Sequence, residues 1–144
     1  MHKWSKLKCL LEKEFLAESL HGIVKYSLTK YHWSNSDYYG RFVIKIHDKE
    51  VFIANYDNFY KEFNKLFPDY KKKNNIGLYR LDEMIDDDLS IELSNKGNIS
   101  IPMVLNSVNL YLNQDIKLSM NSPIPTVRLF AILDRRIGKR TTFN

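Results

Sequence analysis

Three consecutive segments alternate apolar and polar residues with a period of two, and only short stretches separate them. The segments cover residues 22–33, 39–47 and 50–56. Such alternation, rich in β-branched and aromatic residues, is typical of strands that bury one face. The polar residues 34–37 supply a first turn, and His47-Asp48-Lys49 is a candidate for a tight second turn. The pattern therefore predicts a three-stranded antiparallel meander with one apolar face.

Helical spacing of apolar residues predicts a helix on each side of this meander. Over residues 3–19, Trp4, Leu7, Leu11 and Phe15 recur at intervals of three and four, and Gly22 is expected to stop the helix. After the meander, Asp57 can cap a helix that Pro68 is expected to end, with residues 69–75 as a solvated loop.

The C-terminal half reads as helical throughout. Ser100 is a candidate N-cap for a helix over residues 101–112, and a short helical turn covers residues 114–120. A last helix is expected from residues 123–125 to about Gly138, whereas residues 79–93 are ambiguous and any helix there breaks near Asp88. A chain of 144 residues has the length of one ordinary domain. We therefore predict a single α+β domain over residues 1–144, with helices packed on one face of the sheet.

A helical wheel of the last predicted helix places Asp134 in the middle of its apolar face. A carboxylate in a core is costly unless it is paired or hydrogen-bonded, so we expect Asp134 to be buried with a partner. Position 138 is Gly, so no cation four residues further on can serve. The candidate partners are Ser5, Lys6, the indole of Trp4 or backbone amides of the first helix.

The cations at the end of the chain gather on the opposite side of the same wheel: Arg128, Arg135, Arg136, Lys139 and Arg140. In the interpretation that we favour, they complement the helix dipole and solvate the surface. In the alternative, they form a stripe that grips phosphate groups or an acidic protein. The stripe lacks the interleaved aromatic residues that are typical of single-strand binders.

An acidic run around Asp86, Asp87 and Asp88 contrasts with the net charge of +5. The run lacks the spacing of a calcium-binding loop, so we favour a solvated helix face or a patch for a basic partner. The sequence contains no glycine-rich phosphate loop, no His-Glu-x-x-His motif and no cysteine pair. We therefore expect no metal, no cofactor and no catalytic site.

The single cysteine, Cys9, excludes an internal disulfide and fits a reducing compartment. No apolar stretch is long enough to span a bilayer, and the amphipathic N-terminus is not of the signal-peptide type. The expected location is therefore the cytoplasm, with no membrane partner. Nothing in the sequence indicates the oligomeric state.

Two motifs near the ends of the chain carry a resemblance. They are WSKLKCLLEKEF at residues 4–15 and LDRRIGKR at residues 133–140. The chain resembles a small uncharacterised bacterial family with WSKLK-like and LDRRxGKR-like signatures, whose genes often lie near those of polymorphic toxins. The resemblance implies an immunity-like role with no assigned catalytic residues. The expected function is therefore a non-catalytic binding protein for a protein partner, which a toxin domain would fit, and the alternative is nucleic-acid binding through the Arg/Lys stripe.

Overall fold

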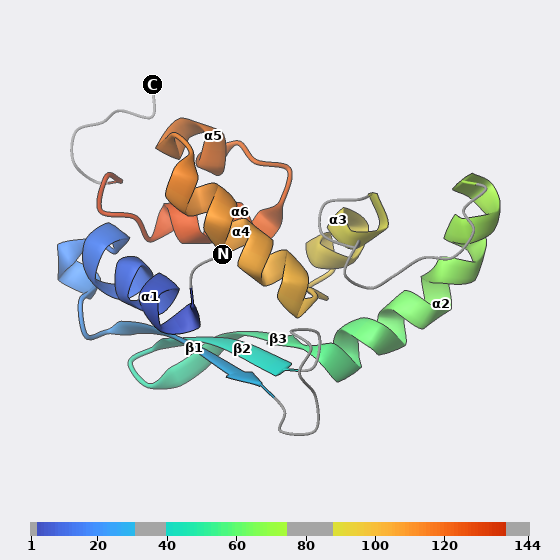
Figure 1. The fold of residues 1–144 in the computed structure, drawn as a ribbon, viewed down its shortest axis with the longest axis horizontal. Helices are drawn as coiled ribbons and strands as arrows, with labels where there is room; N and C mark the ends of the chain where they lie inside the picture. The colour runs from blue at the N-terminus through green and yellow to red at the C-terminus, as the bar shows by residue number, and fades with distance from the viewer. Residues whose placement is uncertain (1–2, 31–39, 75–87, 138–144) are drawn as a thin grey trace.

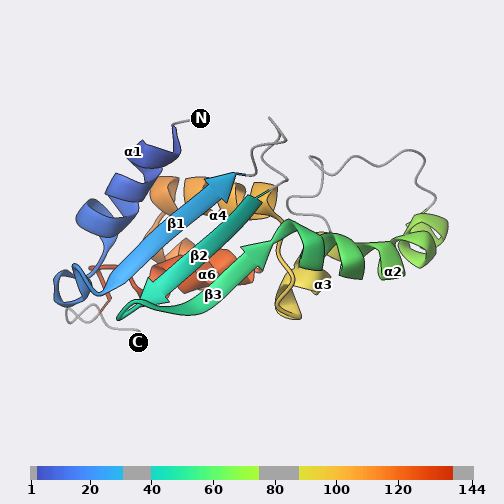
Figure 2. The same ribbon diagram turned by 90° about the horizontal axis from the view of Figure 1, so that it is seen from below.

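A computed structural model describes residues 3–30, 40–74 and 88–137. It contains a three-stranded antiparallel sheet in the order β1-β2-β3 and a helical C-terminal half (Figure 1). In Figure 2, α4 and α6 lie behind the sheet and α1 lies beside β1. The predicted α+β class is confirmed. The described elements, in chain order, are α1 (Trp4–Cys9), η1 (Leu10–Phe15), η2 (Glu18–Leu20), β1 (Val24–Lys30), β2 (Gly40–Ile46), β3 (Lys49–Asn55), α2 (Tyr56–Asn74), α3 (Asp88–Asn95), α4 (Ile101–Asn113), α5 (Ile116–Met120) and α6 (Pro125–Ile132).

The meander has the predicted strands, and its second turn is a two-residue hairpin loop. Ile46 pairs with Lys49, and the loop residues His47 and Asp48 both have positive φ, at 52° and 64°. Two consecutive left-handed residues define a type I′ turn, whose twist matches that of the strands. The register then shifts so that Val51 is an extra residue in β3, a β-bulge. The first predicted turn, at residues 34–37, lies outside the described residues.

Aromatic side chains form the centre of the core between the sheet and the helices. The Phe130 ring of α6 lies 5.7 Å from that of Tyr26 in β1, 6.2 Å from that of Phe42 in β2 and 5.7 Å from that of Tyr111 in α4. All four side chains are buried. Aromatic pairs at these distances stabilise a fold beyond the area that they bury. Phe130 therefore joins α6 to both the sheet and α4.

The first helix is shorter than the predicted range of residues 3–19. α1 continues as the π-helical segment η1 and ends at Phe15, and Leu16 is already extended. The carbonyl of Phe15 accepts from the amide of Arg135 at 2.8 Å, and the amide of Ala17 donates to the carbonyl of Leu133 at 3.0 Å. Pairing with the C-terminal segment thus satisfies the backbone that a longer helix would have paired internally. Gly22, at φ 79°, belongs to the turn before β1.

The second helix is longer than predicted, because Pro68 lies inside α2 rather than at its end. A proline in a helix interior removes one backbone hydrogen bond without always breaking the helix. Residues 69–74, predicted as a loop, form the last turns of α2. Asp57 is also not the cap, since it lies within the helix and its amide donates to Oδ1 of Asn55 at 2.8 Å.

α4 and α6 begin where the sequence predicts, whereas α5 begins at Ile116, two residues later than predicted. The amide of Met103 donates to the Ser100 hydroxyl at 3.2 Å, so Ser100 caps α4. α5 follows, but α6 ends at Ile132 instead of continuing to about residue 138. Asp134 therefore lies beyond the helix, where it forms an isolated antiparallel bridge with Leu16.

Candidate functional site

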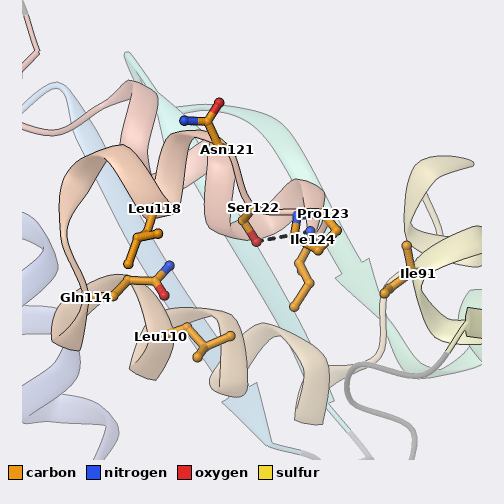
Figure 3. A pocket seen from close by; sticks show the side chains of 8 residues that line it. All are labelled: Ile91, Leu110, Gln114, Leu118, Asn121, Ser122, Pro123 and Ile124. Carbon is orange, nitrogen blue, oxygen red and sulfur yellow. Dashed lines mark hydrogen bonds between the residues drawn. The ribbon is translucent and has the colours of Figure 1, made fainter.

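An apolar groove of about 420 Å³ lies among α3, α4, α5 and the loop before α6, and we call it the α5 groove. Figure 3 shows Leu118 of α5 and Leu110 of α4 on the same side of this groove. Leu118 is 62% exposed and Leu110 is 36% exposed. The groove is lined by Ile91, Leu110, Gln114, Leu118, Asn121, Ser122, Pro123 and Ile124. Two exposed leucines beside one cavity form a surface suited to an apolar side chain of another molecule.

Local capping interactions fix the polar groups around the α5 groove. Asp115 accepts from the amide of Lys117 at 2.8 Å and so caps α5. Gln114 Nε2 donates to the hydroxyl of Ser119 at 3.0 Å, and the amide of Ile124 donates to the hydroxyl of Ser122 at 3.1 Å. These bonds within the wall hold the short helix in place. The polar side chains Gln114 and Ser122 thus form hydrogen bonds within the wall, whereas Leu110 and Leu118 are exposed to solvent.

Asp134 is 1% exposed, as the sequence predicts, but its partners are not those expected from the first helix. The hydroxyl of Tyr111 donates to its Oδ2. Arg136 donates from Nε to Oδ1 at 2.8 Å, from Nη2 to Oδ2 at 2.7 Å and from its backbone amide to Oδ1 at 2.7 Å. The expectation failed because Asp134 lies after the end of α6 and begins a turn, in which the amide of Ile137 donates to its carbonyl, so a residue only two positions away can reach its carboxylate.

Burial alone would raise the pKa of Asp134, but the hydrogen bonds from Arg136 and Tyr111 outweigh it and lower the pKa below its ordinary value. Burial raises the pKa of Tyr111, and its hydrogen bond to Asp134 raises it further. The pKa of Arg136 is raised chiefly by its hydrogen bonds to Asp134. The three groups are therefore an ionised carboxylate, a neutral phenol and a guanidinium, an arrangement that holds residues 134–136 against α4.

The predicted cationic stripe is divided in the structure. Arg136 binds Asp134 instead of lying opposite to it, and the guanidinium groups of Arg135 and Arg136 lie 5.6 Å and 5.7 Å from the centre of the Phe15 ring. Arg128 donates from Nη1 to the carbonyl of Ser122. Lys139 and Arg140 lie outside the described residues. The single helical face proposed for the five cations is thus wrong for the described three, because α6 ends at Ile132.

Of the acidic residues 86–88, the structure describes only Asp88. Asp88 is exposed at the first turn of α3, whereas Asp86 and Asp87 lie outside the described residues. Across residues 3–30, 40–74 and 88–137, no group of three or more histidine, cysteine, aspartate or glutamate side chains is arranged to hold a metal ion. Over the same ranges, no helix is both long and apolar enough to cross a membrane.

Sequence patterns did not indicate the residues that form the α5 groove or those that pair with Asp134. Tyr111 occupies an ordinary core position on α4, and nothing in its spacing indicates a carboxylate more than twenty residues away. Leu118 lies in a short helix of five residues, too few for periodicity to show which side faces solvent. The packing of α5 against α4 reveals the position of Leu118, and the packing of the segment after α6 against α4 reveals that of Tyr111.

The comparisons with known proteins address the family of the chain. No curated protein and no solved structure matches it. The family model that does match covers residues 3–144, which is nearly the full length and includes both end motifs. The chain therefore belongs to the SF0329 protein family.

Proposed function

We propose that this protein is a non-catalytic binding protein that docks a partner protein at the α5 groove. The observation that carries the proposal is the exposure of Leu118 at 62% beside a cavity of about 420 Å³. Large aliphatic side chains grouped at a cavity and framed by polar residues are typical of surfaces that another protein covers. The partner would insert an apolar side chain between Leu110 and Leu118.

The expected contribution of this contact is moderate. Full burial of a leucine side chain stabilises a complex by about 1.5–3 kcal/mol, and a few such anchors commonly dominate an interface. Leu118 is the natural anchor, because it projects from α5 and is the more exposed of the two leucines. The polar groups around it, which include Gln114 and Asn121, would form the rim.

The finer form of the proposal is an immunity protein that neutralises a toxin domain. It is supported by the resemblance of residues 4–15 and 133–140 to a family whose genes often lie near those of toxins. The acidic residues 86–88 suit a basic toxin such as a nuclease, whereas the net charge of +5 argues against a partner that is strongly basic over its whole surface. A partner with an apolar anchor and a mixed rim satisfies both observations.

The test is affinity capture from the native host with three forms of the protein: wild type, Leu118→Glu and Leu118→Met. The wild type and Leu118→Met should retain the same protein, because methionine keeps the apolar surface. Leu118→Glu should lose at least tenfold in affinity, because a carboxylate would be desolvated in the groove. A partner that binds the Glu variant as tightly as the wild type would remove the α5 groove from the interface.

Nucleic-acid binding is the competing outcome. Fluorescence anisotropy with a labelled 30-nucleotide single-stranded RNA at low salt distinguishes it. We expect no saturable binding. Saturable binding that weakens steeply with salt and is lost in Arg128→Ala or Arg135→Ala would favour the alternative function.

A further inference from the structure

A second surface, separate from the α5 groove, lies along the free edge of β3. The sheet order is β1-β2-β3, so β3 pairs with β2 on one side only. Within the described part of the chain, no backbone hydrogen bond joins residues 49–54 of β3 to any element outside the sheet. The outward N–H and C=O groups of such an edge can pair with another strand.

Proteins usually protect exposed edges with charges or bulges, and β3 has such protection only at its start. Lys49 and Glu50 are charged, and the bulge at Val51 follows them. From Val51 to Asn55 there is no charged residue, and the side chains of Val51 and Ile53 are 56% and 43% exposed. The second half of β3 is therefore an unprotected edge with an apolar outer face.

On the inner side of this edge, α6 forms the floor of a cavity of about 280 Å³. Phe52 of β3 lines the cavity together with Leu129 and Ile132 of α6, and Ile132 is 63% exposed. Side chains of a strand alternate between its two faces. An additional strand beside β3 would thus place one set of side chains against Ile132 and Leu129, and the other set beside Val51 and Ile53.

A buried polar atom in the same wall points to a ligand. Thr126 is 1% exposed and lines the cavity, and its hydroxyl has no hydrogen-bond partner within the described part of the chain. An unpaired buried hydroxyl is costly, and a polar group from an occupant of the cavity would relieve that cost.

The net charge of the sheet indicates which charge a segment bound at the β3 edge would carry. Residues 24–30 and 40–55 contain five Lys or Arg and two Asp or Glu, a net charge of +3. Both acids are matched within the sheet, Asp48 by Lys25 at 3.7 Å and Glu50 by Arg41 at 2.7 Å. Lys45 and Lys49 add positive charge around β3, and Arg128 adds more at the cavity wall. A second copy of this sheet would therefore be repelled, and an acidic strand would be attracted.

We propose that the free edge of β3 binds an extended segment of a partner protein, in which acidic residues alternate with aliphatic ones, as a fourth antiparallel or parallel strand. Main-chain hydrogen bonds would supply affinity, and the cavity against α6 would select the aliphatic side chains. The β3 edge and the α5 groove share no lining residue, so the proposal for one surface can be disproved without affecting the proposal for the other.

The probe is a blocked octapeptide of alternating Glu and Val, with an octapeptide of alternating Lys and Val as the matched control. Two-dimensional amide NMR of the full chain should show that the acidic peptide shifts resonances of residues 51–55 and of Ile132. Hydrogen exchange of β3 amides should slow at least tenfold. The basic peptide should cause neither change.

Two variants sharpen the test. Ile132→Glu should weaken binding of the acidic peptide at least tenfold, because it places a carboxylate in the cavity wall. Lys72→Glu, on the exposed side of α2, lowers the net charge by more and should leave binding within about twofold, which controls for long-range charge. The proposal is overturned if neither peptide binds, if both bind equally, if the shifts fall elsewhere, or if the protein alone pairs β3 edges in a dimer seen by light scattering.

Discussion

The molecule has two hydrophobic clusters of very different size. One lies between the sheet and the helices that cover it, which we call the main body, and the other lies between α2 and α3. Among the described residues, nineteen buried hydrophobic residues form the main core, most of them from the N-terminal helix, the sheet, α4 and α6. Only four form the satellite cluster between α2 and α3: Phe59, Phe63, Leu89 and Leu93. Figure 1 shows the far end of α2 extending away from the body. The two regions use similar side chains, but the satellite cluster contains far fewer of them.

The difference indicates that the two regions are not equally stable. Stabilisation by burial grows with the apolar area removed from water, at about 25 cal/mol per Å². In the satellite cluster the rings of Phe59, Phe63 and Phe67 stack along one side of α2, at 5.9 Å and 4.8 Å between successive centres. Leu66, Phe67 and Tyr70 remain partly exposed. We therefore expect α2 to open locally at a lower free energy than the sheet.

The largest effect is expected from Asp134→Ala in the main body. It leaves the guanidinium of Arg136 and the hydroxyl of Tyr111 without their acceptor. Removal of one partner of a buried ion pair lowers the free energy of unfolding by about 3–5 kcal/mol. Urea denaturation followed by circular dichroism measures the loss. Asp69→Ala, at an exposed acid on α2, is the control and should change it by less than about 0.5 kcal/mol. Equal losses would show that Asp134 has no anchoring role.

Truncation of one phenylalanine in each region tests the comparison directly. Phe130→Ala should lower the free energy of unfolding by about 3–5 kcal/mol, because the ring contacts both the sheet and α4. Phe63→Ala should cost about 1–3 kcal/mol, because its partly open surroundings can relax into the space. Native-state hydrogen exchange should show that Phe63→Ala affects only α2 and α3. Loss of protection in β2 as well would mean that the two regions unfold as one unit.

Pro68→Ala should strengthen the weaker region. Alanine restores a backbone N–H for the carbonyl of Asn64 and removes the clash of the proline ring, which together are worth up to about 3 kcal/mol in a helix interior. Hydrogen exchange of amides 64–72 should slow, while protection in the sheet stays unchanged. An unchanged exchange rate in α2 would indicate that Pro68 costs this helix nothing.

The smallest effect is expected from a change of pH near neutrality. The pKa of Asp134 is lower in the folded protein than in the unfolded chain, so its contribution is fully present above the unfolded value of about 3.9 and is lost as the pH falls through the folded value. The contribution of Asp134 to the free energy of unfolding should be nearly constant from pH 7 to 5 and should fall below pH 4. Asp134→Asn should reduce the slope below pH 4. Parallel curves for the two proteins would contradict the lowered pKa.

Much of the fold could be predicted because its signals are local. Period-two alternation predicted all three strands, and the hairpin turn at His47 and Asp48 followed from them. The cap at Ser100 could be predicted because its hydroxyl binds the amide of Met103, only three residues further along the chain. Each of these features depends on residues that are close in sequence or on the simple requirement that one face be apolar.

The rest was decided by contacts between distant parts of the chain. The first helix stops at Phe15 because residues 133–135 pair with residues 15–17, and no local pattern reports a partner more than a hundred positions away. The same pairing takes Asp134 off α6 and turns it toward Arg136. Likewise, the α5 groove exists only where a five-residue helix meets α4. The sequence alone thus determined the three strands, the presence of most helices and the burial of Asp134. Tertiary packing decided where the helices end, which groups pair with that carboxylate and which leucines face the solvent.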